Sequence, residues 1–394
     1  MDNGTGRSDV RVPFFRHDLG QDELSSVAKV LAGRVLTTGE AVDEFEAAFA
    51  SFLGRRNVVA VTSCTAAIQL SLNALGIGHG DEVITTPMTF LATATAIMQA
   101  GARPVFVDVE PDTGNLDADR IVEAITPRTR AIVPVHLYGH MCDMTAISTV
   151  AARHGLAVIE DAAHCVEGSR DGARPGDLGR TSCFSFYATK SLACGEGGAV
   201  ATDDDELARR LRLLRLHGVT ANAADRVRDG YRHYDMVTLG WKYNMDNVHA
   251  ALLAPQVPRL GERHEARRRL AQRYVDGLGG VQGVSWPTTR PGTDHARHLF
   301  PIWVSHRDAV LDDLLDTGIE VVVNYRAIHE LTYLSHALGY RRGDFPVAER
   351  IGDSTISLPL YPTMPVADVD LVTAAVASAV SRRVAEACRS SRSR

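Results

Sequence analysis

The chain has 394 residues, 45% of them hydrophobic and 23% charged, which is ordinary for a globular protein with a sizeable core and two domains. Its 42 Lys and Arg against 48 Asp and Glu leave a net charge of −6, so charge gives no reason to expect a nucleic acid or an anionic membrane as partner. No apolar stretch is long enough to span a bilayer, and the polar N-terminus does not resemble a signal peptide. The 6 cysteines form no CxxC pair, so we predict reduced thiols, a cytoplasmic location and no metal site.

The first part of the chain predicts an α/β domain. We expect residues 1–12 to be disordered and residues 22–52 to form helices interrupted at Gly33 and Gly39. A helical pattern covers residues 143–155, with Asp143 as N-cap and Gly155 as terminator. Alternating strands and helices indicate a mostly parallel sheet covered on both faces. The predicted strands are the β-branched runs at residues 58–62, 83–86, 104–108, 131–136, 157–161 and 198–202.

The pattern changes after residue 203. A basic helix at residues 205–216 is followed by a polar loop at 220–235 and a long helix at 246–272, which Pro255 and Pro258 interrupt. Short strands and helices then predict a smaller α+β domain. We therefore divide the chain into a disordered N-terminus at 1–12, a large domain with N-terminal helices at 13–255, a small domain at 256–380 and a basic flexible tail at 381–394.

Lys190 and Asp161 are the two residues that best indicate chemistry. Lys190 follows an apolar strand, and a lysine amine in a partly desolvated pocket loses its proton more easily and attacks aldehydes. Asp161 ends another strand that reads as buried, and a buried carboxylate needs a cationic partner. An aldehyde cofactor with a protonated pyridine nitrogen would satisfy both residues. The alternative for Asp161 is an N-cap for a helix starting at Ala162.

The segment around Ser63 and Thr65 predicts a phosphate site. A strand ends there and an apolar helix begins, so free N–H groups and hydroxyls meet at a helix N-terminus. The alternative is simple N-capping by Ser63 or Thr65. Ser185, close before Lys190, could also bond a phosphate, while Gly195, Gly197 and Gly198 would allow a close approach or a sharp turn.

Four further residues near these motifs have both a functional and an ordinary interpretation. Phe90 follows a strand and could stack on a flat heterocycle, although a lone Phe more often belongs to the core. His164 could touch the same ring or be a satisfied structural histidine. Cys64 and Cys194 are better explained as small packing residues than as nucleophiles.

Taken together, the motifs resemble the DegT/DnrJ/EryC1/StrS family of sugar aminotransferases, which use pyridoxal 5′-phosphate (PLP). The resemblance implies the PLP-dependent transferase fold type I, like that of aspartate aminotransferase. This fold has a large domain with a mostly parallel seven-stranded sheet and a smaller C-terminal α+β domain. The motifs that carry the resemblance are Thr37-Thr38-Gly39, Ser63-Cys64-Thr65-Ala66-Ala67, Thr86-Pro87-Met88-Thr89-Phe90, Glu160-Asp161-Ala162-Ala163-His164, Phe184 to Lys190 with Gly195 to Gly198, Leu214-Arg215-Leu216-His217-Gly218, and Ser357-Leu358-Pro359-Leu360-Tyr361.

The resemblance also implies residue roles. Lys190 would hold the PLP aldehyde and shuttle a proton, Asp161 would pair with the pyridinium nitrogen, and His164 would lie near the 3′-oxygen. Phe90 would stack on the ring. The phosphate and its surroundings would be bound by Ser63, Cys64, Thr65, Ala66 and Ser185.

The family completes each site with a segment of a neighbouring subunit, which implies a homodimer with shared active sites. In this chain the segment reads Gly240-Trp241-Lys242-Tyr243-Asn244. Lys242 stands where the family most often has asparagine, and Asn244 where it most often has arginine. Lys242 of the partner subunit could therefore supply the positive charge near the phosphate.

The implied activity is amino-group transfer, with glutamate as donor and a keto group of a nucleotide-activated deoxy sugar as acceptor, C4 being favoured. Such a reaction belongs to amino-sugar biosynthesis, often in secondary metabolism. Candidate substrate contacts are Thr38, Gly39, His217, Tyr325 and His329, together with the loop at 220–235. Tyr325 and His329 would share a face only if they were helical, and both could equally be ordinary structural residues.

Several other functions are compatible with parts of the pattern. An aminotransferase for a keto-cyclitol or a 3-keto sugar would use the same residues. A PLP-dependent sugar dehydratase of this fold has histidine in place of the lysine, so Lys190 argues against it. The intact site set also argues against a non-enzymatic regulatory relative. A nucleotide-binding oxidoreductase lacks support because the chain has no dinucleotide fingerprint.

Overall fold

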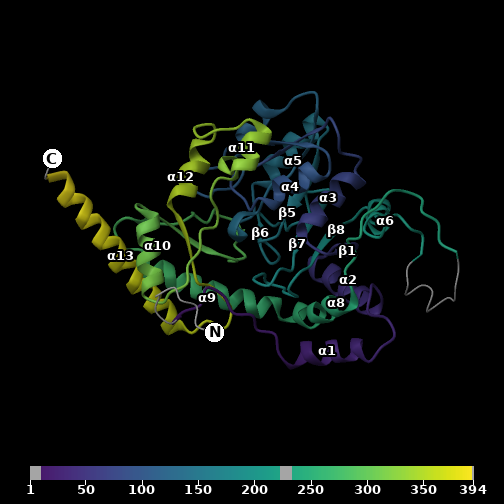
Figure 1. The fold of residues 1–394 in the computed structure, drawn as a ribbon, viewed down its shortest axis with the longest axis horizontal. Coiled ribbons are helices and arrows are strands. Elements are labelled where there is room, and N and C mark those ends of the chain that lie inside the picture. Colours follow the sequence, from purple (N-terminus) through teal and green to yellow (C-terminus); the bar gives the residue numbers. More distant parts are fainter. Residues whose placement is uncertain (1–9, 222–232, 393–394) are drawn as a thin grey trace.

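The computed structural model describes residues 10–221 and 233–392. Its centre is a seven-stranded sheet in the order β1-β8-β7-β5-β4-β2-β3. Figure 1 shows β1, β5, β7 and β8 of this sheet with helices around them. Only β8 runs opposite to the other strands of the sheet, so the predicted mostly parallel sheet is confirmed. Its strands are β1 (Asn57–Val61), β2 (Glu82–Thr85), β3 (Arg103–Phe106), β4 (Thr129–Ile132), β5 (Ala157–Asp161), β7 (Thr181–Ser185) and β8 (Gly198–Thr202).

Helices cover both faces of this sheet, because its strands are apolar on both sides. One face packs against α3 (Cys64–Ala74) and α6 (Asp205–Leu214), and the other against α2 (Glu40–Leu53) and α8 (Asn247–Leu253). As predicted, the Asp143 side chain caps α5 (Met144–His154) and Gly155 ends it at φ 66°. The other elements of this part are α1 (Gln21–Leu31), α4 (Ala92–Gln99), η1 (Ala118–Ala124), η2 (Leu137–Gly139) and β6 (Ser169–Arg170).

The predicted long helix at 246–272 consists of three consecutive pieces: α8, the 3-10 turn η3 (Ala254–Arg259) and α9 (Leu260–Leu278). Pro258 lies inside η3, and proline cannot donate the backbone hydrogen bond of a helix interior. In Figure 1, α9 runs from α8 towards α10 and α13, so it connects the two halves of the molecule. No helix in the described residues has the length and apolar character needed to cross a membrane.

A second apolar core lies at the C-terminal end and is built around a three-stranded antiparallel sheet in the order β12-β11-β9. α9 and the last helix pack beside one another against this core. The elements of this part are β9 (Val284–Ser285), β10 (Thr293–Asp294), β11 (Phe300–Val304), α10 (Arg307–Asp316), η4 (Ile328–Glu330), α11 (Thr332–Leu338), α12 (Pro346–Ser354), β12 (Thr355–Leu358) and α13 (Val366–Arg392).

Both ends of the chain differ from the prediction. Val12 was expected in a disordered N-terminus, but it is 1% exposed and bridges Ile319 in the second core. At the other end, the expected flexible tail continues α13 as far as Arg392. Arg383 there donates to Asp313 of α10 at 3.0 Å, which anchors this part of the helix. We propose that the small domain therefore includes residues 10–12 as well as residues 256–380.

The aromatic cluster between α2 and the sheet generates a stability prediction. The Phe49 ring lies 5.1 Å from Phe184 and 5.5 Å from Phe186, and it is fully buried. We expect Phe49→Ala to lower the free energy of unfolding by about 3–5 kcal/mol, because it removes buried surface and leaves a cavity. Thermal and urea unfolding would measure the loss. Phe52→Ala, at a half-buried ring on the same helix, is the control, and an equal loss in both variants would contradict the prediction.

Candidate active site

Lys190 lies in the loop after β7 and is half-buried. Its Nζ is 3.4 Å from Nε2 of His298. Burial lowers the pKa of the Lys190 amine to about 8, although the nearby Asp161 and Cys64 act in the opposite direction. A much larger fraction of this amine is therefore neutral near pH 7 than for an exposed lysine, as a nucleophile requires.

The Asp161 carboxylate at the end of β5 is buried, and neutral groups hold it. It accepts hydrogen bonds from the Thr93 hydroxyl at 2.8 Å and from the Ala163 N–H at 3.2 Å. The Cys64 thiol lies 3.8 Å away. Across residues 10–221 and 233–392, no cation lies within ion-pair distance of it. A buried carboxylate of this kind is suited to a cationic ring nitrogen.

The helix expected at Ala162 does not form, because residues 162–168 make turns. The capping alternative for Asp161 is therefore wrong, and the turns bring His164 back towards the site. Nδ1 of His164 accepts the Tyr138 N–H at 3.3 Å, which places the ring proton on Nε2, 3.1 Å from the Tyr325 hydroxyl. Burial, aided by Lys190, holds the pKa of His164 well below its usual value, so this ring is neutral.

Phe90 is not a core residue, since 54% of its surface is exposed. Its ring centroid lies 5.9 Å from that of Tyr325, tilted by 45°. The Thr93 N–H donates to the Phe90 carbonyl while the Thr93 hydroxyl donates to Asp161. Phe90 is therefore an exposed aromatic ring in the turn next to the buried carboxylate.

The start of α3 presents backbone N–H groups and hydroxyls at a helix N-terminus. The Ser63 hydroxyl accepts the Ala66 N–H at 3.1 Å, so Ser63 is the N-cap, while half-buried Thr65 follows in the first turn. Ser185 on β7 pairs with Gly198 on β8. A Cβ on Gly198 would lie only 2.3 Å from the Ser63 carbonyl carbon, so glycine lets β8 touch this turn. The Ser185 hydroxyl and the free N–H groups of α3 thus face the same corner of the sheet.

The other glycines and the cysteines have structural roles. Gly195 turns the chain at φ 90°, and Gly197 is packed against Cys194 and Met245. Burial raises the pKa of the Cys64 and Cys194 thiols, so both stay protonated. These cysteines are packing residues, as the sequence indicated, and Cys64 additionally lies beside Asp161.

The Lys242 segment runs along the end of β1, where the Thr62 N–H donates to the Tyr243 carbonyl. Asn244 is buried between Lys242 and Thr38: it accepts from Lys242 Nζ at 2.5 Å and donates to the Thr38 hydroxyl at 2.7 Å. Thr38 in turn donates to the Met245 carbonyl at 2.6 Å. Thr38 and Asn244 are therefore occupied within their own chain.

Lys242 lines an open cavity of about 470 Å³ together with Leu36, Thr37, Thr62 and Asp246. Gly39 caps α2 beside the same segment, since a Cβ there would come within 3.0 Å of the Asn247 side chain.

The remaining predicted substrate residues do not lie together at one site. Tyr325 reaches the site through His164. His329 does not, because it is fully buried and hydrogen-bonds Glu349 at 3.0 Å. The two do not share a helical face, since only η4 at Ile328–Glu330 is helical there. His217 is exposed in the turn beside the Lys242 segment, and residues 222–232 of the predicted loop lie outside the described residues.

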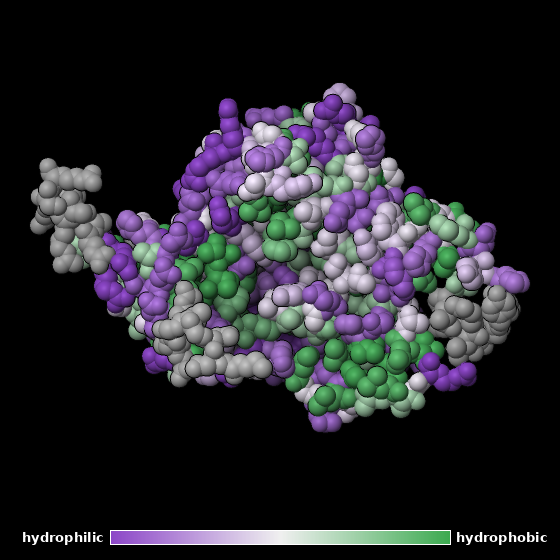
Figure 2. Space-filling view, in the orientation of Figure 1, coloured by the Kyte–Doolittle hydropathy of each residue, from purple (hydrophilic) through white to green (hydrophobic). Residues whose placement is uncertain are grey.

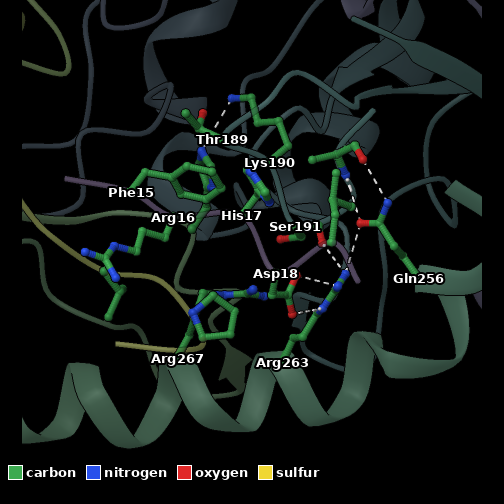
Figure 3. A pocket seen from close by; sticks show the side chains of 15 residues that line it. Phe15, Arg16, His17, Asp18, Thr189, Lys190, Ser191, Gln256, Arg263 and Arg267 are labelled. Carbon is green, nitrogen blue, oxygen red and sulfur yellow. Dashed lines mark hydrogen bonds and ion pairs between the residues drawn. The ribbon is translucent and has the colours of Figure 1, made fainter. Parts of the chain in front are cut away.

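Sequence reasoning missed His298 and the arm at residues 15–19. His298 lies in an irregular stretch before β11, and its ring centroid is 4.5 Å from that of His164. Burial, Lys190, His164 and Arg267 all lower its pKa, so it is neutral. The arm and Lys190 line a common pocket above α9 (Figure 3). Both missed elements come from irregular segments, which carry no periodic signal.

The similarity to known proteins extends over nearly the whole chain. The model of the DegT/DnrJ/EryC1/StrS aminotransferase family matches residues 17–377. The chain belongs to this family. It is 42% identical over 373 residues to the spore coat polysaccharide biosynthesis protein SpsC of Bacillus subtilis, covering 93% of this chain and 96% of that protein.

Solved structures agree with the fold. DesV of S. venezuelae, solved with a ketimine intermediate, is 36% identical with a TM-score of 0.87, covering 94% of this chain and 98% of that one. DesI, solved in the presence of its TDP-sugar product, is 31% identical with a TM-score of 0.83, covering 93% and 92%. The predicted fold type and large mostly parallel sheet are confirmed.

This family member is a PLP-dependent aminotransferase, and similar structures exist in PLP and pyridoxamine phosphate forms. The residues present fit PLP. A half-buried amine, a buried carboxylate that lacks a cation, an exposed aromatic ring and a helix N-terminus correspond to its aldehyde, ring nitrogen, ring face and phosphate.

The packing of Gly198 generates a prediction for cofactor binding. We expect Gly198→Ala to weaken PLP binding by about tenfold or more, because the new Cβ must push the start of α3 away from Ser185. Fluorescence titration of ligand-free protein with PLP would measure this. Gly261→Ala is the control, since nothing lies within 4 Å of a Cβ at Gly261 in α9. Equal PLP affinity in both variants would contradict the prediction.

The pKa of Lys190 sets a pH dependence. Below a pH of about 8 the amine is mostly protonated and cannot attack an aldehyde, so imine formation by ligand-free protein should speed up through about pH 8 and then level off. Stopped-flow absorbance with PLP would record this. The same reaction with a free lysine derivative corrects for the titration of PLP itself. A midpoint near the ordinary lysine value of 10.5 would contradict the prediction.

Proposed function

We propose that this enzyme transfers an amino group from glutamate to the C4 keto group of a nucleotide-activated deoxy sugar, in amino-sugar biosynthesis. The observation that carries the assignment of its site is the Lys190 amine of lowered pKa close to the buried Asp161 carboxylate. The similarity to SpsC and to DesI, which was solved with a TDP-sugar product, supports a nucleotide sugar as the acceptor. The C4 position and the glutamate donor rest on the family resemblance of the motifs.

When bound, PLP supplies an aldehyde and an electron-withdrawing pyridinium ring. Lys190 would hold that aldehyde, and its released Nζ would take a proton from the donor carbon and return one to the acceptor carbon. Asp161 would keep the ring nitrogen protonated through its negative charge. Phe90 would cover the ring, and Ser185 with the first turn of α3 would hold the phosphate.

We propose a homodimer in which Lys242 of the partner subunit completes the phosphate site. Lys242 is exposed on an open cavity, and its ammonium, which donates one hydrogen bond to Asn244, has two further N–H donors for a second chain. Large apolar side chains are exposed nearby on α1 and the segment after it, including Leu31 at 61% and Leu36 at 51%. Figure 2 shows an apolar patch in this region. Such patches are typical of subunit contacts.

The experiment is a substrate panel on purified protein loaded with PLP. We expect glutamate to bleach the yellow cofactor, and a 4-keto nucleotide sugar to restore it and yield a 4-amino product identified by mass and NMR. Lys190→Ala should lose the imine absorbance and at least about 100- to 10,000-fold in rate. An amino product from a 3-keto sugar or a keto-cyclitol alone would move the assignment to that substrate. Colour that glutamate never bleaches would contradict the proposal.

A further inference from the structure

Two arginines one turn apart on α9, Arg263 and Arg267, are buried between this helix and the loop that carries Lys190 (Figure 3). Only 5% and 3% of their surfaces are exposed. A buried guanidinium is costly unless anions and hydrogen-bond acceptors surround it. The partners of these two arginines all belong to segments that line the active site.

Arg267 forms the centre of the first set of contacts. One of its terminal nitrogens, Nη2, lies 2.5 Å from Oε1 of Glu167, and only 4% and 3% of the two side chains are exposed. The other carboxylate oxygen of Glu167 accepts the Ser191 hydroxyl at 3.2 Å. Nε of Arg267 donates to the Ala296 carbonyl at 3.3 Å.

This one ion pair thus contacts three loops. Glu167 follows His164, Ser191 follows Lys190, and Ala296 precedes His298. The pair therefore connects the segment that carries Lys190 with the segments that carry the two neutral histidines, His164 and His298.

Arg263, one turn before Arg267 on α9, contacts the loop that carries Lys190. It donates to both carboxylate oxygens of Asp18, at 2.8 and 2.5 Å, and to the Ser191 carbonyl at 3.4 Å. It also donates to Gln256 at 3.1 Å, and Gln256 donates to the Ala193 carbonyl at 2.8 Å. Ser191 is therefore held at its hydroxyl by Glu167 and at its carbonyl by Arg263.

We propose that Glu167 and Arg267 are positioning residues whose ion pair fixes Ser191, and thereby the amine of Lys190, against Asp161 and His298. This inference rests on the proposed role of Lys190. Stability alone does not account for the pair, because apolar side chains of similar size often serve a protein core equally well. Directional bonds to three loops provide what apolar packing lacks, which is a fixed orientation of the reacting groups.

Ser191→Ala gives the mildest test, because it removes one hydroxyl and leaves the ion pair intact. A looser loop admits water to the amine, so the titration midpoint of Lys190 should rise from about 8 towards 10.5. We expect a rise of about half a pH unit or more. The variant does not alter the groups that face the amine, which are Asp161, Cys64, His164 and His298. Reaction of ligand-free protein with an amine-labelling reagent across pH, with mass mapping of the Lys190 peptide, would measure the midpoint.

The double variant Glu167→Leu with Arg267→Met tests the pair itself. Removing both charges leaves neither one buried and unpaired, so the fold should survive with a similar melting temperature. We expect the Lys190 midpoint to rise and kcat to fall by about 10- to 100-fold, because the amine is no longer aligned. Arg269→Gln, at an exposed position on the same helix, is the control and should leave both readouts unchanged.

Wild-type midpoints and turnover in both Ser191→Ala and the double variant would overturn the inference. Borohydride trapping of the wild-type holoenzyme distinguishes failure of the positioning inference from failure of the proposed function. A trapped cofactor on Lys190 together with unaffected variants rejects only the positioning role. A trapped cofactor on another residue rejects the proposed role of Lys190, and the inference with it.

Discussion

The site depends on a carboxylate buried at the end of a central strand with only neutral partners. Asp161 is surrounded by the hydroxyl of Thr93, the N–H of Ala163 and the thiol of Cys64. These donors solvate the anion without neutralising it, so its charge remains available to a cationic ligand. In the proposed mechanism, the protonated ring nitrogen of PLP is this cation.

The proposed phosphate site depends on one reversed strand in the same sheet. β8 is the one strand that opposes its neighbours, and it enters the sheet at Gly198, directly against the start of α3. This contact brings the end of β7, with Ser185, beside the free N–H groups of α3. Lys190 lies in the loop that connects β7 and β8. The amine and the proposed phosphate site are therefore linked by a short stretch of chain.

The sequence predicted the large, mostly parallel sheet well, because strands and helices depend on local patterns, and the same patterns generated the candidate site residues. Apolar runs that end in Asp161 or precede Lys190 signal buried strands that deliver polar groups to one edge of the sheet. His329 was predicted as a substrate contact because spacing alone could not show that it is buried and that its partner is Glu349. The burial of Val12 and the contributions of His298, Arg263 and Arg267 depend on contacts between segments far apart in the chain. Such contacts leave no periodic signal in the sequence.

The buried ion pair also bears on the protonation of Lys190, because the guanidinium of Arg267 lies near an amine that must lose its proton. Arg267 contributes to lowering the pKa of His298, whereas burial alone lowers that of Lys190. Glu167 lies 2.5 Å from the guanidinium of Arg267 and compensates its charge at close range. Lys190 is thus shifted by desolvation to a pKa near physiological pH and is not driven further by a neighbouring charge. The Lys190 amine must be neutral to attack an aldehyde and must also be able to carry a proton. An unpaired positive charge on Arg267 would favour the neutral amine and so weaken its capacity to carry a proton.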